Sequence, residues 1–240
     1  MIKITSPNFD KRLNDADPSV IVLHYTGMGN AVEALEVLCD PFAKVSAHYF
    51  VDEDGSVLNL VKDNKRAWHA GISYWKGDTD INSRSIGIEI VNPGHEYGYR
   101  RFTDAQMNVV TELCRDLIKK YNIRADHILG HSDVAPERKI DPGELFDWQG
   151  LAQDGVGLWP EPTQADFKEA ADLVKNEYNF QHLLAEFGYN PLAAYVDVVT
   201  AFHRHFYPEK FRDGGNPAAV DETSAARLLA LVRASRALKT

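Results

Sequence analysis

Apolar residues run in short blocks through the first 130 positions, and the blocks differ in period. Positions 20–23 are all apolar, which is typical of a buried strand. Ile86, Ile88 and Ile90 alternate with other residues and share one face of a second strand. Asp54-Gly55 lies between two short apolar runs and favours a hairpin turn. The predicted strands cover residues 19–24, 49–51, 57–60, 86–90 and 128–131.

Helical spacing marks a second set of segments. Thr103 and Gln106 form a capping box ahead of an amphipathic helix that extends to Tyr121. Asn30 is expected to cap a shorter helix that ends near Pro41. Proline and glycine then recur from 133 to 162, which predicts a long loop with little regular structure.

The residues after 163 have helical periodicity throughout. One predicted helix ends at Gly188, another begins at Asn190-Pro191, and the last begins after Asp221. This change from a proline- and glycine-rich segment to helical periodicity predicts a domain boundary near 160–165. The organisation expected is a first domain over 1–162 and a helical domain over 163–240.

Composition narrows the classes of function. The 240 residues carry 26 Lys+Arg against 35 Asp+Glu, so the net charge is −9, which argues against nucleic-acid binding because phosphate contacts need clustered cations. Cys39 and Cys114 lie in helix-like patterns and are expected to be buried free thiols. The sequence has neither an apolar run of about 18 residues nor a secretory signal core. We therefore expect a soluble cytoplasmic protein, or a periplasmic or outer-membrane-anchored one if a signal was removed.

Three residues have the chemistry of a metal site. His24 and His131 end predicted strands, and Asp141 follows ten residues after His131. Two imidazoles and a carboxylate, with water in the fourth position, form the ligand set of a catalytic zinc. The alternative is that these are ordinary core or surface groups, and spacing alone does not decide between the two. His48 and His127 are further possible ligands.

A carboxylate and a lysine stand out beside them. Glu89 shares a strand face with Gly87, where it either meets solvent or acts as a general base with a raised pKa. Lys139 lies two residues before Asp141, so an extended backbone would point both the same way. It would face negative charge that develops on a substrate, or it is a solvated loop lysine.

Five separated blocks give the chain a family resemblance. In order and spacing they resemble the zinc-dependent N-acetylmuramoyl-L-alanine amidases of the AmpD/AmiD type, relatives of phage T7 lysozyme and the peptidoglycan recognition proteins. The resemblance covers about residues 18–160, and the segment after about 180 resembles a small helical peptidoglycan-binding-like module. The blocks are Leu23-His24-Tyr25-Thr26, Ala67-Trp68-His69-Ala70-Gly71, Ser85-Ile86-Gly87-Ile88-Glu89, Gly130-His131-Ser132-Asp133-Val134-Ala135-Pro136 and Lys139-Ile140-Asp141-Pro142-Gly143.

The resemblance implies both a site and a reaction. The family's zinc ligands fall on His24, His131 and Asp141, and its catalytic residues fall on Glu89 and Lys139. The implied cofactor is Zn²⁺. The implied reaction is hydrolysis of the amide between the lactyl group of N-acetylmuramic acid and L-alanine. The implied partners are peptidoglycan or (anhydro)muropeptides in cell-wall turnover and recycling, with no nucleic acid and no membrane span.

Two residues in a family block, and Arg84 in the polar loop before the Glu89 strand, are candidates for substrate contacts. Trp68 and His69 would line a sugar or peptide cleft, or simply pack a hydrophobic corner. Arg84 would bind a stem-peptide carboxylate in bidentate fashion, or lie solvated at the surface. The expected fold class is α/β, with a central mixed β-sheet flanked by helices and a small all-α C-terminal domain.

Three rival functions remain open from the sequence. The first is a peptidoglycan-binding protein without catalysis. The second is a zinc peptidase that cuts within the stem peptide. The third is a structural or regulatory role for the helical segment after 163.

Overall fold

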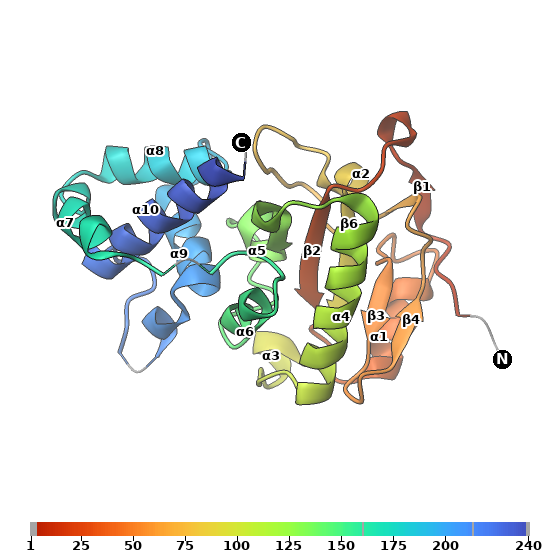
Figure 1. Cartoon of the computed structure of the whole chain (residues 1–240). Coiled ribbons are helices and arrows are strands. Elements are labelled where there is room, and N and C mark those ends of the chain that lie inside the picture. Colours follow the sequence, from red (N-terminus) through yellow and green to blue (C-terminus); the bar gives the residue numbers. More distant parts are fainter. Residues whose placement is uncertain (1–3, 160, 213, 239–240) are drawn as a thin grey trace.

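A mixed five-stranded sheet lies at the centre of the structure (Figure 1). This computed structural model describes residues 4–159, 161–212 and 214–238. The strand order is β4-β3-β6-β2-β7, in which β4 pairs antiparallel with β3 and the other pairs are parallel. The strands are β2 (Val20–Tyr25), β3 (Tyr49–Val51), β4 (Val57–Asn59), β6 (Ser85–Ile90) and β7 (Ile128–Gly130). The α/β fold class and the mixed sheet are thereby confirmed.

A second, two-stranded sheet was not predicted from the sequence. Strand β1 (Phe9–Lys11) pairs antiparallel with β5 (Lys65–Ala67) at the edge of the molecule. Both strands have three residues and are rich in charge, so neither shows the apolar alternation on which strand prediction depends. A 3₁₀ turn, η1 (Leu13–Asp15), follows β1.

One face of the central sheet is covered by α4 (Asp104–Tyr121), which crosses the front of the sheet in Figure 1. The capping box between Thr103 and Gln106 is present, as predicted. Val110 and Leu117 of this helix are buried against Ile21 and Ile86 of the sheet. Each such fully buried aliphatic side chain contributes about 1.5–3 kcal/mol. Helix α1 (Ala31–Cys39), capped by Asn30 as expected, packs over the edge that contains β3.

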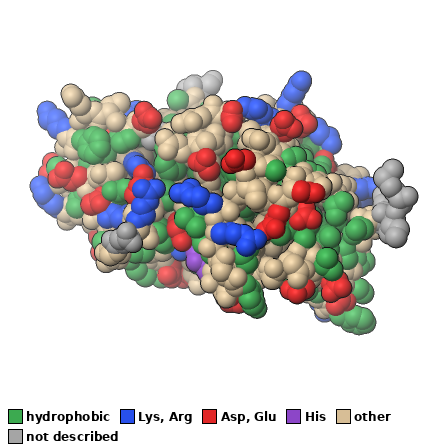
Figure 2. Space-filling model, turned by 90° about the horizontal axis from the view of Figure 1, so that it is seen from below, with side chains coloured by type: hydrophobic (Ala, Val, Ile, Leu, Met, Phe, Trp, Pro, Cys, Tyr) green, Lys and Arg blue, Asp and Glu red, His purple; other side chains and the backbone are tan. Residues whose placement is uncertain are grey.

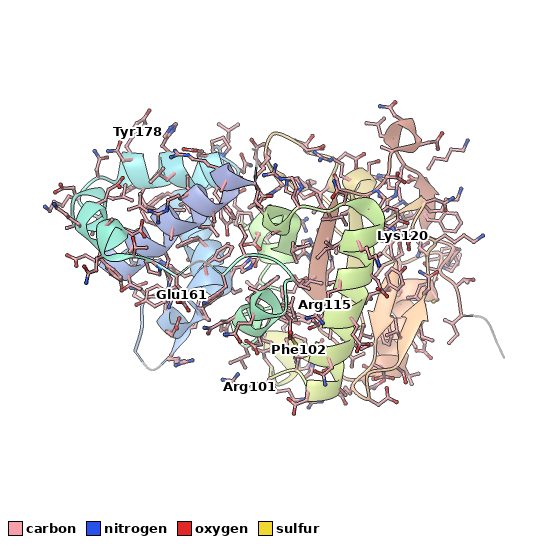
Figure 3. All side chains as sticks on the ribbon, in the orientation of Figure 1. Arg101, Phe102, Arg115, Lys120, Glu161 and Tyr178 are labelled. Atoms are coloured by element: carbon pink, nitrogen blue, oxygen red, sulfur yellow. The ribbon has the colours of Figure 1, made fainter. Side chains whose placement is uncertain are left out.

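The opposite face of the sheet meets the C-terminal helices. These are α7 (Gln164–Leu173), α8 (Glu177–Phe187), α9 (Tyr195–Phe206) and α10 (Glu222–Ala237), with the 3₁₀ turn η3 (Pro208–Phe211) after α9. Val20 and Val22 of β2 belong to the same buried cluster as Phe202 of α9 and Leu231 of α10. On the outer side, Tyr178 of α8 points away from the sheet and is 76% exposed (Figure 3). We call residues 163–238 the helical tail.

Local structure departs from the prediction at three places. The segment 133–162 is not all loop, because it includes the second half of α5 (His131–Val134) and all of α6 (Trp148–Gln153). His131 therefore begins a helical turn after β7 rather than ending the strand. Helix α9 begins at Tyr195, not at Asn190-Pro191, because the Asn190 side chain accepts from the Leu192 N–H and closes a turn there.

The remaining short elements are α2 (Ile81–Arg84), α3 (Gly94–Tyr97) and η2 (Ala125–His127). Arg115 of α4 donates to the Asp154 backbone and carboxylate and so ties α4 to the turn after α6 (Figure 3). Within the described ranges, no helix is long and apolar enough to cross a bilayer.

Candidate active site

Parallel pairing brings the first two site residues together. His24 lies near the end of β2 and is the register partner of Glu89 on β6. Partners in adjacent parallel strands point to the same face of a sheet. His131 is the first residue after β7, the strand on the other side of β2. The strand order therefore gathers residues from three distant parts of the chain at one end of the sheet.

Three ligand atoms meet at that point. His24 Nδ1 lies 3.0 Å from His131 Nδ1 and 2.9 Å from Asp141 Oδ2, and His131 Nδ1 lies 3.1 Å from the same oxygen. All three residues are buried. Ligand atoms about 2.0–2.1 Å from a tetrahedral zinc are roughly 3.3 Å apart, so the triangle has nearly the size that zinc needs. The structure thus brings His24, His131 and Asp141 together as the sequence predicted.

The charge states of this triangle suit a cation. Burial lowers the pKa of His24 to about 4, with His131 as a further cause, so the imidazole is neutral and its nitrogen lone pair is available. Burial by itself would raise the pKa of Asp141, but His131 and His24 together hold it well below its usual range. His24 therefore presents a neutral imidazole and Asp141 an ionised carboxylate, which are the protonation states that metal ligation requires of these two groups.

The outer nitrogens of both histidines are also hydrogen bonded. His24 Nε2 lies 3.0 Å from His69 Nδ1, and His131 Nε2 lies 3.1 Å from the carbonyl oxygen of Ala70. His69 Nε2 in turn lies 3.0 Å from Ser85 Oγ, which donates to a helix carbonyl. Such outer partners fix the tautomer and the ring orientation of ligating histidines.

Glu89 faces the triangle without a hydrogen-bond partner of its own. Its Oε2 is buried and accepts no hydrogen bond from the described residues. Burial raises the pKa of Glu89 well above its usual range, with Asp141 as a second cause and Lys139 as the opposing one. A buried, unpaired carboxylate is costly to keep. The residue as a whole is only partly buried and lines a cleft, so a reacting water or amine could reach its carboxylate from there.

A cleft of about 480 Å³ opens over these groups. His24, Glu89, His131, Lys139 and Asp141 all line it, and Trp68 and His69 lie in its wall. The cleft is at the end of the sheet to which β2 points in Figure 1. Figure 2 shows the molecule from that side, with histidine visible between acidic and basic side chains.

Three candidates from the sequence lie elsewhere. Arg84 ends α2, at the other end of β6 from Glu89, where it binds Asp78 and Ser19 Oγ and does not line the cleft. His48 is hydrogen bonded to Gly87 N–H and to Arg12, and His127 to the Ser19 carbonyl. Neither histidine belongs to the ligand triangle.

Sequence analysis did not identify two groups that support the site. Arg138 lines the cleft and donates to the carbonyl of Ile72, which fixes the loop after His69. The Ala70 carbonyl supports His131 through the backbone. A backbone acceptor carries no signature in residue types, so only the fold could show it.

The sequence matches a known protein family. A family model described as N-acetylmuramoyl-L-alanine amidase matches residues 14–144, more than half of the chain. The chain is 35% identical over 226 residues to the N-acetylmuramoyl-L-alanine amidase AmiD of Escherichia coli. This alignment covers 86% of this chain and 79% of AmiD. The chain belongs to the N-acetylmuramoyl-L-alanine amidase family. Members of this family hydrolyse the amide between muramic acid and L-alanine, and the implied reaction is confirmed at that level.

Other amidases support the assignment. The 1,6-anhydro-N-acetylmuramyl-L-alanine amidase AmpD of Haemophilus influenzae is 39% identical over 165 residues, covering 61% of this chain and 88% of AmpD. A solved E. coli AmiD complex has a TM-score of 0.78 at 31% identity and covers 93% of both chains. AmpDh3 of Pseudomonas aeruginosa has a TM-score of 0.79 at 26% identity, over 98% of this chain and 99% of that one. The last two alignments include the helical tail.

Proposed function

We propose that this amidase is a zinc enzyme, with the ion held by His24 Nδ1, His131 Nδ1 and Asp141 Oδ2. The observation that carries the proposal is the triangle of ligand atoms 2.9–3.1 Å apart, beside Glu89, whose buried Oε2 accepts no hydrogen bond from the described residues. The hydrogen bonds on the outer nitrogens of both histidines support it. A site with three protein ligands keeps a fourth position open, as catalytic zinc requires.

The residues around the ion would divide the chemistry among them. Zinc bound there supplies an acidified water near neutral pH and an electrophile for the scissile carbonyl. The Glu89 carboxylate takes a proton from the attacking water and later delivers it to the amine nitrogen of L-alanine. The Lys139 ammonium faces the carbonyl oxygen and stabilises its developing negative charge. The products are a free lactyl carboxylate and an intact stem peptide.

The substrate class is proposed from the relatives. The E. coli AmiD structure contains anhydro-N-acetylmuramic acid-L-Ala-D-γ-Glu-L-Lys, and the AmpDh3 structure contains an anhydromuramic pentapeptide. We propose that this chain acts on such anhydromuropeptides or on peptidoglycan, in cell-wall turnover and recycling. Trp68, in the wall of the cleft, offers a face on which sugar or peptide can stack.

The organisation into residues 1–162 and 163–240, with a peptidoglycan-binding-like second part, stays a prediction. So does the place of action in the cell, for which we keep the cytoplasm as the expectation and the periplasm or outer membrane as the alternative. Comparing the action of the whole chain on intact sacculi and on soluble fragments would test the first point.

Mass spectrometry of an anhydromuropeptide incubated with the purified protein tests the proposal. We expect release of an intact stem peptide that begins at L-alanine, and we expect a zinc chelator to stop it. Zinc added back after chelation should restore the release. An unchanged substrate from zinc-loaded protein would favour the binding protein without catalysis. Cleavage inside the peptide would favour the peptidase.

A further inference from the structure

A buried carboxylate behind the active site, that of Asp133, accepts hydrogen bonds both from the residues before 160, which we call the catalytic part, and from the helical tail. Asp133 is 1% exposed and accepts three hydrogen bonds. The Gly130 N–H donates to Oδ2 at 2.7 Å, within the catalytic part. The other two donors come from the tail: His205 Nδ1 of α9 at 2.7 Å from Oδ2, and the Tyr189 hydroxyl at 2.6 Å from Oδ1.

Asp133 lies in the short turn that places two of the proposed zinc ligands. Helix α5 begins with His131 and includes Asp133. Between them, the Ser132 N–H donates to the backbone carbonyl of Asp141 at 3.0 Å. The position of α5 therefore sets His131 directly and Asp141 through one hydrogen bond. A helix of four residues has too few internal hydrogen bonds to hold its own orientation.

Helix α9 also holds the far end of the same loop. Arg204, next to His205, is buried and lies 3.5 Å from the carboxylate of Glu144. Glu144 in turn lies 3.2 Å from His95 Nε2, and His95 Nδ1 lies 3.1 Å from the Tyr25 hydroxyl in the cleft wall. Two adjacent residues of α9 thus hold positions 133 and 144, and Lys139 and Asp141 lie between them.

Packing around the contact favours a fixed geometry. The His205 ring is stacked between Trp148 at 3.7 Å and Phe206 at 3.7 Å. Burial raises the pKa of Tyr189 well above its usual range, with Asp133 as a second cause, so the phenol keeps the proton that it donates. Removing one donor from a buried carboxylate leaves a lone pair that no water can satisfy.

We propose that Asp133 is a positioning residue through which Tyr189 and His205 of the helical tail hold α5, and with it His131 and Asp141, in ligating geometry. The tail is then part of the catalytic apparatus and does more than bind cell wall. The zinc component of this inference depends on the proposed function, whereas the ordering of α5 does not.

Tyr189→Phe tests the idea with one atom removed. Ser235→Ala is the matched control, because Ser235 of α10 also donates a hydroxyl across the same interface to a buried carboxylate, that of Asp126, at 2.6 Å. Asp126 lies before β7, at the opposite end of that strand from α5. Two quantities are measured on full-length protein: the zinc Kd by competition with a chelating dye, and hydrogen exchange of the 128–141 peptide in metal-free protein.

We expect Tyr189→Phe to weaken zinc binding about 10-fold, within the range seen when an outer partner of a metal site is lost. We expect exchange in 128–141 to be about 10-fold faster. Ser235→Ala should leave both quantities within about twofold of wild type, even if its Tm falls equally. Equal zinc Kd and equal exchange in the two variants would overturn the proposal.

A second variant covers the case in which Tyr189→Phe does not fold. His205→Phe keeps the ring stack and loses the hydrogen bond to Asp133, and the same two measurements apply. If wild-type protein binds no zinc, the proposed function fails. The exchange comparison in metal-free protein then still decides whether the tail holds α5.

Discussion

Replacing Glu89 with glutamine separates proton transfer from the other roles of the site. Glutamine has almost the same shape but cannot take a proton from water. Glu89 is not one of the three residues in the ligand triangle, so the variant should retain one zinc per chain. We expect kcat to fall while zinc content and KM stay close to wild type.

The structure sets the size of that fall. A general base contributes roughly 10²–10⁴-fold, about 2.7–5.4 kcal/mol of barrier at 1.36 kcal/mol per tenfold. Asp141 also lines the cleft, but the histidines lower its pKa, so it cannot replace the lost base. Burial raises the pKa of Glu89, which makes its carboxylate a stronger proton acceptor. We therefore expect a loss toward the upper end, about 10³–10⁴-fold.

The thermal stability of metal-free Glu89→Gln should rise at high pH, although its kcat falls. A carboxyl whose pKa is raised on folding contributes stability that is present at low pH and lost as pH rises. Glutamine carries no charge, so metal-free Glu89→Gln should melt at a higher temperature than wild type at pH 8. The difference should shrink toward pH 4. Thermal unfolding from pH 4 to 8 measures this, and anhydromuropeptide hydrolysis followed by mass spectrometry measures kcat.

Two results would refute the reasoning. If Glu89→Gln turned over within about threefold of wild type, another group would be the base. If metal-free Glu89→Gln melted below metal-free wild type at pH 8, the Glu89 carboxylate would have an unrecognised partner. The Glu96→Gln variant is a matched control, because Glu96 also lines the cleft but is exposed.

Three further substitutions probe the neighbouring groups. His69→Ala removes the acceptor of His24 Nε2, so the zinc Kd should rise about 10–100-fold in a chelating-dye competition. Lys139→Met should lower kcat about 10²–10³-fold with little change in KM, as steady-state kinetics would show. Arg84→Ala removes a half-exposed ion pair with Asp78, so the free energy of unfolding should fall by at most about 1 kcal/mol, and KM should not change.

Each of these has a contrary outcome. Wild-type zinc affinity in His69→Ala would leave that residue as a wall of the cleft. A change confined to KM in Lys139→Met would make Lys139 a binding residue. A large rise in KM for Arg84→Ala would mean that substrate reaches the other end of β6.

The sequence by itself determined the elements that local patterns encode. Continuous and alternating apolar runs located β2 and β6, and the capping box at Thr103 located the start of α4. The five family blocks pointed to the amidase reaction and to the ligand set. These signals work because capping, turn formation and the burial of one face depend on residues close together in the chain.

The tertiary structure decided which of those residues act together. His24 and Asp141 are 117 positions apart and meet because β2 pairs with β7 and the loop after α5 is hydrogen bonded back to Ser132. The fold also brings the Ala70 carbonyl, in the loop after β5, to His131, and it leaves Arg84 at the opposite end of β6 from Glu89. A helical turn as short as α5 has four residues, too few to show a periodic apolar pattern in the sequence. Its position depends on long-range packing.

The role of the tail was likewise hidden. Nothing in the local sequence links His205 to Asp133, 72 positions earlier. A contact of that separation depends on how α9 packs against the sheet, and on the need of a buried carboxylate for donors. The residue types determined the chemistry, and the packing determined which groups it joins.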